Sequence, residues 1–183
     1  LLVAPLNLRE KFVALIRREK KHKVAGKEAR IILKFNSLTD MALIDELYAA
    51  SQSGVEIDLI VRGICALRPG IKGLSPTITV RSVVGRFLEH SRIYYFANGG
   101  GGAEEVYIGS ADWMMRNLDR RVEVVLPIID ADIRRYLRHT VLDAYLRDNV
   151  NARLLRPDGT YRKVPGSTPF DAQMYFVGRD YEA

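Results

Sequence analysis

Residues 30–35 read Arg-Ile-Ile-Leu-Lys-Phe, and residues 56–61 read Glu-Ile-Asp-Leu-Ile-Val. Both stretches are short and rich in apolar and β-branched side chains, which predicts two buried strands. Between them lies a segment with one apolar helical face, which Thr39 or Asp40 can cap and which Gly54 can end. A strand, a helix and a second strand joined by short turns form a βαβ unit with parallel strands. The sequence therefore predicts an α/β fold.

Further helices and strands extend this unit on both sides. An N-terminal helix is expected to begin at a capping box of Asn7 and Glu10 and to end at Gly26. A second long helix is expected over residues 130–149, with an apolar stripe against the sheet formed by Ile133, Leu137, Val141 and Tyr145. Additional strands are expected at residues 78–83, 93–96, 106–108 and 121–126, the second and third of them antiparallel around a glycine-rich turn. Together these elements predict a mixed sheet flanked by helices.

The chain has the length of one domain. It contains 183 residues, of which 48% are hydrophobic, enough for a real core. We expect one domain over residues 1–156 and a polar, mobile tail over residues 157–183, with one small hairpin near Asp158 and Gly159. Because the first residue is Leu1 and no secretory signal follows it, the chain is expected to be a piece of a longer protein.

Composition excludes several classes of protein and of site. Apolar runs such as residues 122–129 end at a charge or a proline well before the roughly 18–20 residues that cross a bilayer. The single cysteine, Cys65, excludes an internal disulfide and a multi-cysteine zinc site and is expected to be a core or loop thiol. With only three histidines, no metal site is expected. A cytoplasmic protein is expected, and the sequence leaves membrane association open.

Positive charge is concentrated in two zones. The formal net charge is +6, and residues 9–30 alone hold nine basic and three acidic side chains. This first zone is lysine-rich and helical, which is typical of a solvated face. In the second zone, residues 62–92, five of six cations are arginine and the only acid is Glu89. Because arginine binds phosphate through two parallel hydrogen bonds, the second zone is the better candidate for a site.

A histidine and an arginine stand together at the beginning of the strand predicted near residue 93. Residues 87–92 read Phe-Leu-Glu-His-Ser-Arg, and side chains alternate along a strand, so His90 and Arg92 are expected to point the same way. An imidazole can act as nucleophile or proton donor, and a guanidinium can neutralise phosphate oxygens. The pair therefore favours phosphoryl chemistry; the alternative is a structural histidine bonded to a backbone carbonyl.

A second motif follows this pair. Residues 109–113 read Gly-Ser-Ala-Asp-Trp, and a polar segment at residues 116–123 ends in a glutamate-bearing strand. The layout resembles a half-site of the phospholipase D superfamily, with His-x-Lys on one strand and Gly-Ser-x-Asn after its neighbour. The resemblance implies a phospholipase D-like mixed sheet that forms one half of a two-half catalytic unit. Three positions depart from the pattern: Arg92 replaces lysine, Asp112 replaces asparagine, and Ala97 replaces an aspartate.

A more specific resemblance extends over residues 1–164. It is carried by the motifs at Lys34–Leu38, Leu47–Ser51, Ile60–Cys65, Leu88–Arg92, Asn98–Gly100 and Ser110–Asn117. These motifs are similar to those of bacterial polyphosphate kinases, the ATP-polyphosphate phosphotransferases. The chain looks like the last of that family's four domains, which is the second of its two phospholipase D-like halves.

The resemblance implies a role for each candidate residue. A histidine of the preceding half takes the γ-phosphoryl group of ATP and passes it, reversibly, to polyphosphate. His90 matches the second-half histidine, which would protonate or hydrogen-bond a phosphate oxygen. Arg62 and Arg121 match positions that contact nucleotide phosphates, and Arg92 is expected to bind phosphate beside them.

The same resemblance implies the cofactors and partners. ATP or ADP would be a substrate, and Mg²⁺ would be held by ligands outside this chain, which itself supplies no metal ligand. The implied partners are polyphosphate, the preceding phospholipase D-like domain and further copies of the protein in a homo-oligomer, with no nucleic acid.

Other interpretations of these residues stay open. Arg62 could be an ordinary surface arginine, and Arg121 could pair only with Asp119 or Glu123. Near the second motif, Ser110 and Asp112 are expected to hold a turn rather than to touch substrate. Trp113 and Met114 are expected to pack in the protein interior.

Two other functions also stay open. One is a phosphodiesterase or nuclease that acts as a homodimer, which Arg92 and Ala97 disfavour. The other is a noncatalytic module that binds polyanions through the N-terminal helix.

Overall fold

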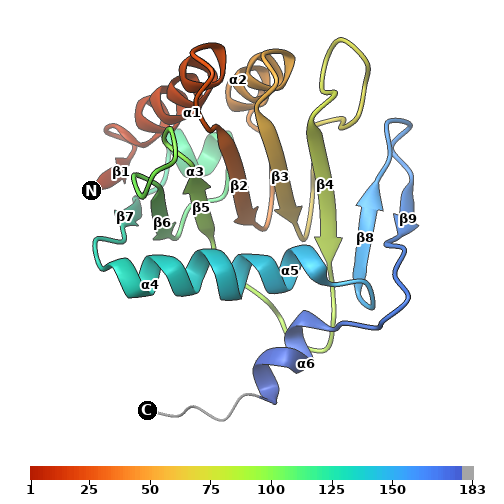
Figure 1. Cartoon of the computed structure of the whole chain (residues 1–183). Coiled ribbons are helices and arrows are strands. Elements are labelled where there is room, and N and C mark those ends of the chain that lie inside the picture. Colours follow the sequence, from red (N-terminus) through yellow and green to blue (C-terminus); the bar gives the residue numbers. More distant parts are fainter. Residues whose placement is uncertain (179–183) are drawn as a thin grey trace.

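The computed structural model describes residues 1–178 as a single sheet between two layers of helices (Figure 1). The sheet has nine strands in the order β1-β7-β6-β5-β2-β3-β4-β8-β9. The strands are β1 (Leu2–Ala4), β2 (Arg30–Phe35), β3 (Glu56–Val61), β4 (Ile78–Val83), β5 (Ile93–Phe96), β6 (Glu105–Gly109), β7 (Glu123–Pro127), β8 (Ala152–Leu155) and β9 (Tyr161–Lys163). The helices are α1 (Leu8–Val24), α2 (Met41–Gln52), α3 (Met115–Asp119), α4 (Ala131–Tyr136), α5 (Asp143–Arg147) and α6 (Ala172–Val177).

The predicted βαβ unit is confirmed. Strands β2 and β3 are parallel, with Arg30 opposite Glu56 and Phe35 opposite Val61, and β4 continues the parallel arrangement beyond β3. Helix α2 connects β2 with β3, and the carboxylate of Asp40 caps it by accepting a hydrogen bond of 3.1 Å from the backbone N–H of Leu43. The expected antiparallel pair of β5 and β6 is also present, so the sheet is mixed.

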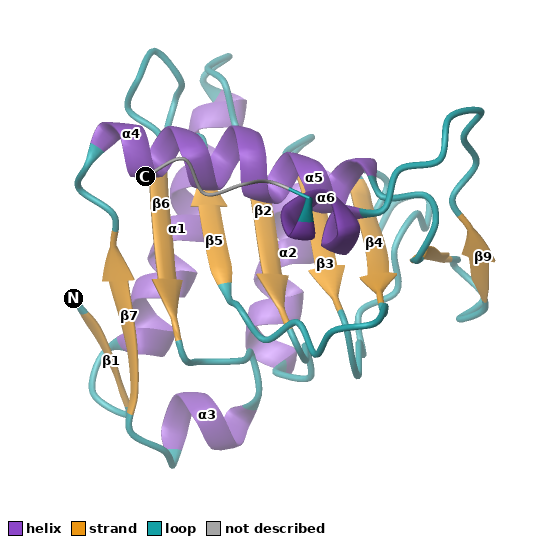
Figure 2. Ribbon diagram, turned by 90° about the horizontal axis from the view of Figure 1, so that it is seen from below, coloured by secondary structure: helices purple, strands orange, loops and turns teal. Residues whose placement is uncertain are grey.

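Alternation along the central strands produces two cores. Ile31 and Leu33 of β2 pack in the core beneath α1 and α2, whereas Ile32 packs in a second core with Leu142 and Tyr145. Figure 2 looks onto one face of the sheet, with the helix from α4 to α5, together with α6, in front of the strands and α1 and α2 behind them. Because both faces are covered, the central strands are almost continuous apolar runs.

The N-terminal helix begins at the predicted position, but the predicted capping box is wrong. Asn7 is the N-cap residue of α1, yet its side chain makes no cap hydrogen bond. Its Oδ1 atom instead accepts a hydrogen bond of 2.8 Å from the backbone N–H of Val3. The asparagine is therefore used to hold β1, which pairs with β7 and was not predicted from the sequence.

The predicted long helix is present from α4 to α5, with a π-helical turn at Leu137–Leu142. Leu137, Val141 and Tyr145 contact the second core as expected, but Ile133 is 51% exposed. A π turn has more residues than an α turn, so it rotates the preceding residues out of register with those that follow. The predicted stripe is therefore wrong for Ile133.

The C-terminal segment has more structure than the sequence suggested. The hairpin at Asp158 and Gly159 is confirmed as the turn between β8 and β9, with Gly159 at a φ of 87°. Helix α6 was not predicted; it buries Ala172 in the second core. The mobility expected for residues 157–178 stays a prediction, and the expected tail over 179–183 lies outside the described residues. No helix among residues 1–178 has both the length and the hydropathy needed to cross a membrane.

Candidate functional site

The candidate site lies where the parallel strands β2 and β3 end. Asn36 follows β2 and Arg62 follows β3, so both residues reach the same edge of the sheet. The Nε atom of Arg62 donates a hydrogen bond of 3.1 Å to Oδ1 of Asn36. Gly63 allows the two chains to approach, because a Cβ atom there would lie 2.9 Å from the carbonyl oxygen of Asn36. This edge is where open α/β sheets bind their ligands.

Asp112 connects this edge to the segment before β5. Its Oδ1 atom accepts hydrogen bonds from the backbone N–H groups of Asn36 at 2.7 Å and Ser37 at 3.3 Å. The guanidinium of Arg92 binds the same carboxylate at two points, Nε to Oδ1 at 3.2 Å and Nη2 to Oδ2 at 3.1 Å. Asp112 thus holds backbone, but that of the segment after β2 and not that of its own turn as predicted, and it is also paired with Arg92.

His90 completes the cluster from the exposed side. Its Nδ1 atom lies 3.5 Å from Nδ2 of Asn36, and its carbonyl oxygen accepts a hydrogen bond of 3.0 Å from Nη1 of Arg92. His90 and Arg92 therefore face the same group of residues, as predicted, although β5 begins only at Ile93. The side chain of His90 is exposed, and within residues 1–178 its Nε2 atom has no protein partner. That nitrogen is free to bind a ligand.

A second network fixes the residues on either side of His90. The ammonium group of Lys34 donates to Oε1 of Glu89 at 3.0 Å, to the carbonyl oxygen of Ser91 at 3.1 Å and to its Oγ at 2.8 Å. The same Nζ atom lies 4.6 Å from the ring centroid of Tyr145, whose hydroxyl donates to Glu89. All three donors of Lys34 are therefore used within the protein.

Burial and charge shift the pKa values in this network. Burial alone would raise the pKa of Glu89, but the ammonium of Lys34 and hydrogen bonds from Ser91 and Tyr145 lower it to about 2. Burial lowers the pKa of Lys34, an effect that Glu89 opposes. Sequence reasoning missed this pair, although a lysine within an otherwise apolar strand was a signal that a buried partner must exist.

Arg121 makes no direct contact with this cluster, although it precedes β7 at the same edge of the sheet. It is exposed between α3 and β7, and no contact within residues 1–178 links it to His90 or Arg62. The alternative pairing is absent as well, because Asp119 binds Arg9 at 2.6 Å and Glu123 accepts hydrogen bonds from Ser110 and Asn117. The role predicted for Arg121 therefore stays a prediction.

Two other side chains belong to the protein interior. Trp113 is fully buried, with its ring centroid 4.9 Å from that of Phe12 and 5.4 Å from that of Phe35, so it packs and offers no surface to an adenine ring. Cys65 is half-buried, and burial raises the pKa of its thiol to about 11. A thiol with such a pKa is unreactive at neutral pH.

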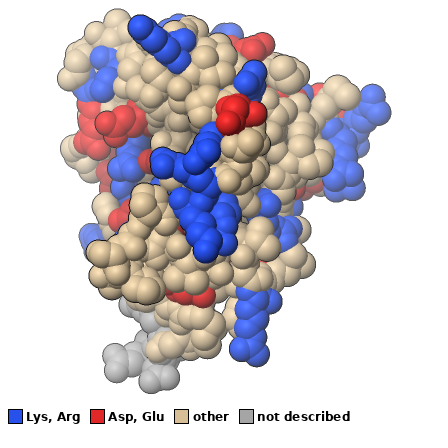
Figure 3. Space-filling view, turned by 90° about the vertical axis from the view of Figure 1, so that its right-hand side faces the viewer, with Lys and Arg blue, Asp and Glu red and all other residues tan. Residues whose placement is uncertain are grey.

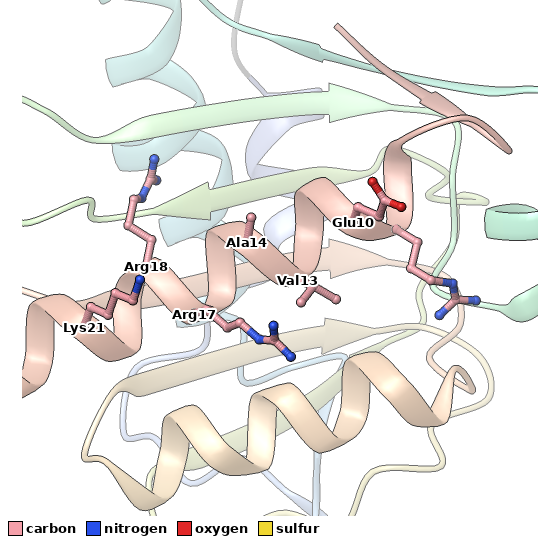
Figure 4. A pocket seen from close by; sticks show the side chains of 7 residues that line it. Glu10, Val13, Ala14, Arg17, Arg18 and Lys21 are labelled. Atoms are coloured by element: carbon pink, nitrogen blue, oxygen red, sulfur yellow. The ribbon is translucent and has the colours of Figure 1, made fainter.

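The basic N-terminal helix α1 lies over the face of the sheet opposite to the helix from α4 to α5 (Figure 2). A shallow groove of about 490 Å³ runs along α1, where Figure 4 shows the cations Arg17, Arg18 and Lys21 around the small side chains Val13 and Ala14. Arg17 pairs with Glu46 at 2.5 Å and Arg18 with Glu105 at 2.9 Å. These pairs neutralise part of the helix, which disfavours α1 as a binding surface for polyanions.

Another basic surface lies at the edge strands. Figure 3 looks onto the molecule from the side of β8 and β9 and shows Lys and Arg gathered in the middle of this face. The β8–β9 hairpin contains Arg153, Arg156, Arg162 and Lys163. Strand β8 pairs with β4, and β4 pairs with β3, which leads to Arg62.

Comparison with known proteins gives consistent matches over nearly the whole chain. The family described as polyphosphate kinase C-terminal domain 2 matches residues 1–173. A polyphosphate kinase of Synechocystis is 56% identical over 173 residues, which are 94% of this chain and 23% of that protein. A polyphosphate kinase of Paraburkholderia phytofirmans is 52% identical over 177 residues, 96% of this chain and 26% of that protein. The chain thus spans about a quarter of the length of these curated relatives.

Solved structures agree with the expected fold. The crystal structure of polyphosphate kinase from Porphyromonas gingivalis matches 97% of this chain, and 28% of that chain, with a TM-score of 0.90 and 43% identity. Nuc from Salmonella typhimurium, a phospholipase D family member, matches 85% of this chain and 95% of that chain with a TM-score of 0.58 at 14% identity. The second match concerns the fold alone and confirms the predicted phospholipase D-like mixed sheet.

Proposed function

The chain belongs to the polyphosphate kinase C-terminal domain 2 family, and on this premise we propose that it supplies half of a site for reversible phosphoryl transfer between ATP and inorganic polyphosphate. The observation that carries the proposal is that Arg62 and the exposed His90 both contact Asn36 at the carboxyl edge of parallel strands. Nε of Arg62 lies 3.1 Å from Oδ1 of Asn36, and Nδ1 of His90 lies 3.5 Å from Nδ2 of Asn36. A phosphate group placed there would meet a cation and an imidazole nitrogen together.

The proposed chemistry divides the work between two halves. A histidine of the preceding phospholipase D-like domain attacks the γ-phosphorus of ATP, so a phosphorus–nitrogen bond forms as the bond to the ADP oxygen breaks. The terminal oxygen of polyphosphate then attacks that phosphorus and regenerates the histidine. His90, through Nε2, donates a proton or a hydrogen bond to the oxygen that leaves or enters.

The arginines contribute to different degrees. Arg62 uses only Nε for its bond to Asn36, so its two terminal nitrogens can both reach phosphate oxygens. Arg92 uses three of its five N–H donors on Asp112 and the carbonyl of His90, which leaves it two for phosphate. Arg121 belongs to the same proposal by family resemblance alone. All three would stabilise negative charge on the transferred group.

Residues 1–178 do not suit a Mg²⁺ site. Among residues 1–178 no group of three or more His, Cys, Asp or Glu side chains converges in a way that could hold a metal ion. The acid of the cluster, Asp112, is already bound by Arg92 and two backbone N–H groups. We therefore assign the ligands of any Mg²⁺ to the nucleotide phosphates and to other parts of the protein.

The proposed partners follow from the same family relation. They are ATP or ADP, polyphosphate and the preceding domain, in a homo-oligomeric cytoplasmic enzyme that binds no nucleic acid.

The direct test is to incubate the full-length protein with γ-³²P-ATP and to analyse the products for acid-insoluble polyphosphate, and then to supply ADP with polyphosphate and measure ATP. Formation of both products supports the proposal; formation of neither refutes it.

A second candidate is a phosphodiesterase, which the similarity in fold to Nuc favours. The substitutions at Arg92, Ala97 and Asp112 relative to the phospholipase D pattern argue against it. The same preparation should be assayed with bis(p-nitrophenyl) phosphate. Cleavage of this diester without phosphoryl transfer from ATP would favour the phosphodiesterase.

A further inference from the structure

A glutamine from the C-terminal helix holds the loop that leads to His90. Gln173 of α6 is only 5% exposed. Its Oε1 atom accepts a hydrogen bond of 2.9 Å from the backbone N–H of Phe87, and its Nε2 atom donates one of 2.8 Å to the carbonyl oxygen of Phe87. A single side chain thus satisfies both backbone groups of a residue in a segment that has no regular structure, as a neighbouring strand would.

Gln173 also lies close to Gly85 in the same loop. A Cβ atom at Gly85 would lie 2.9 Å from Cδ of Gln173 and 3.2 Å from Nδ2 of Asn151. The φ angle of Gly85 is not in the left-handed region, so the backbone itself would accept alanine. An alanine at this position would fit only if the side chain of Gln173 moved, which shows that the loop and α6 pack directly against each other.

Helix α6 is itself fixed to the body of the domain. The fully buried carboxylate of Asp148 accepts hydrogen bonds of 2.8 Å from the backbone N–H groups of Ala172, Asn151 and Ala152. One oxygen therefore holds the beginning of β8 and the other holds the beginning of α6. Figures 1 and 2 both show α6 lying beside α5, on the side of the sheet that carries this loop.

We propose that Gln173 is a positioning residue for His90, acting through the backbone of Phe87. Lys34 of β2 holds the two neighbours of His90, Glu89 and Ser91. Gln173 of α6 adds a second anchor to the same segment at Phe87, three residues before His90. The proposal rests on the proposed function, because it assumes that the position of the His90 imidazole limits the rate of phosphoryl transfer.

The first test compares two glutamine substitutions in the full-length protein. Gln173→Met keeps the length of the side chain and removes both hydrogen bonds. Gln52→Met is the matched control, because Gln52 donates a single bond of 3.0 Å to the carbonyl of Gly73 in a different loop. A misplacement of about 1 Å at a reacting group can lower a rate about 100-fold. We expect kcat to fall about 10- to 100-fold in Gln173→Met, with KM for ATP changed less than threefold and with Gln52→Met unchanged.

Hydrogen–deuterium exchange separates positioning from a general loss of structure. In Gln173→Met, the amide of Phe87, which loses its hydrogen bond to Gln173, should exchange at least tenfold faster, while amides of β2 and β3 keep their protection. Faster exchange in this loop with an unchanged kcat would overturn the proposal, as would slower catalysis with unchanged exchange. If the unsubstituted protein transfers no phosphoryl group at all, the proposed function fails, whereas the exchange result still reports whether Gln173 holds the loop.

A double-mutant cycle provides a second, independent test. Gly85→Ala should lower kcat because its Cβ atom displaces Gln173, but it should have little further effect in a Gln173→Ala background, where the space is empty. The two substitutions should therefore be strongly non-additive. Additive effects on kcat would contradict the proposal, even if Gln173→Met proved too unstable to assay.

Discussion

Arg92 and Asp112 form a two-point ion pair whose side chains are each only 11% exposed. They are also two of the positions at which the chain departs from the histidine–lysine and asparagine pattern of the phospholipase D half-site. In the structure the two departures form a single interaction, because the carboxylate of Asp112 binds the guanidinium of Arg92, which stands in place of lysine. The pair holds a basic side chain beside His90.

The first prediction concerns the energetic coupling of this pair. Asp112→Ala leaves the Arg92 guanidinium buried without its partner, which typically costs about 3–5 kcal/mol. The double variant Arg92→Lys with Asp112→Asn should be more stable than the sum of the single effects, with a coupling of about 1–3 kcal/mol. Urea unfolding of the four proteins measures it. If the single effects simply add, the two side chains are not coupled.

A second prediction concerns Arg62 and Arg121. In the full-length enzyme, Arg62→Ala should lower kcat by about two to four powers of ten if its terminal nitrogens stabilise charge on the transferred phosphate. The same loss is predicted for Arg121→Ala. Arg68→Ala is the matched control, because Arg68 is exposed in the same arginine-rich zone and donates to the carbonyl of Pro157.

The unfolding temperature of these variants should change little. Normal kinetics for Arg62→Ala would make Arg62 an ordinary surface cation. Normal kinetics for Arg121→Ala alone would remove Arg121 from the site.

A third prediction follows from the low pKa of Glu89. Its ordinary value of 4.5 falls to about 2 in the folded protein, so the ionised form stabilises the fold at all pH values above about 4.5. This stabilisation, at most about 3 kcal/mol, is lost as the pH falls from about 4.5 towards 2. The free energy of unfolding of the parent chain and of Glu89→Gln should therefore differ at pH 7 and converge near pH 2. A difference that does not depend on pH would contradict the assignment.

A fourth prediction concerns the isolated 183-residue chain. Because it contains two complete cores around one sheet, it should unfold cooperatively in urea. It should not synthesise polyphosphate from ATP, because catalytic groups that act as a unit lose almost all activity when one is absent. Circular dichroism and the γ-³²P-ATP assay provide the two measurements. Sustained synthesis by this chain alone would show that no second half is needed.

Local signals account for the parts of the fold that were predicted correctly. The apolar runs of β2 and β3, the cap at Asp40 and the glycine after α2 are each encoded within a few residues. Strand β1 and helix α6 were missed because both are short and depend on distant partners. Residues 2–4 become a strand by pairing with β7, and α6 is fixed by Asp148.

The site was predictable in composition but not in arrangement. Alternation predicted that His90 and Arg92 face the same group of residues, and they do, although both precede β5. The strand-end rule predicted Arg62 at the carboxyl end of β3, where it lies; that a ligand binds there stays a prediction. Neither rule could identify Glu89 as the partner of Lys34, because 55 residues separate them in the sequence. The anchoring of Phe87 by Gln173, 86 residues away, was out of reach for the same reason.

The last prediction concerns His90 itself, whose proposed task is to manage the proton or oxygen and not to carry the phosphoryl group. An in-line displacement needs a nucleophile on one side of the phosphorus and a group that serves the leaving oxygen on the other. The most direct measurement is to incubate the full-length enzyme and its His90→Ala variant with γ-³²P-ATP and to map the acid-labile label by peptide analysis. We predict that His90→Ala abolishes polyphosphate synthesis while a histidine outside residues 1–183 is still labelled in both proteins. An acid-labile label on His90 in the intact enzyme would contradict this account.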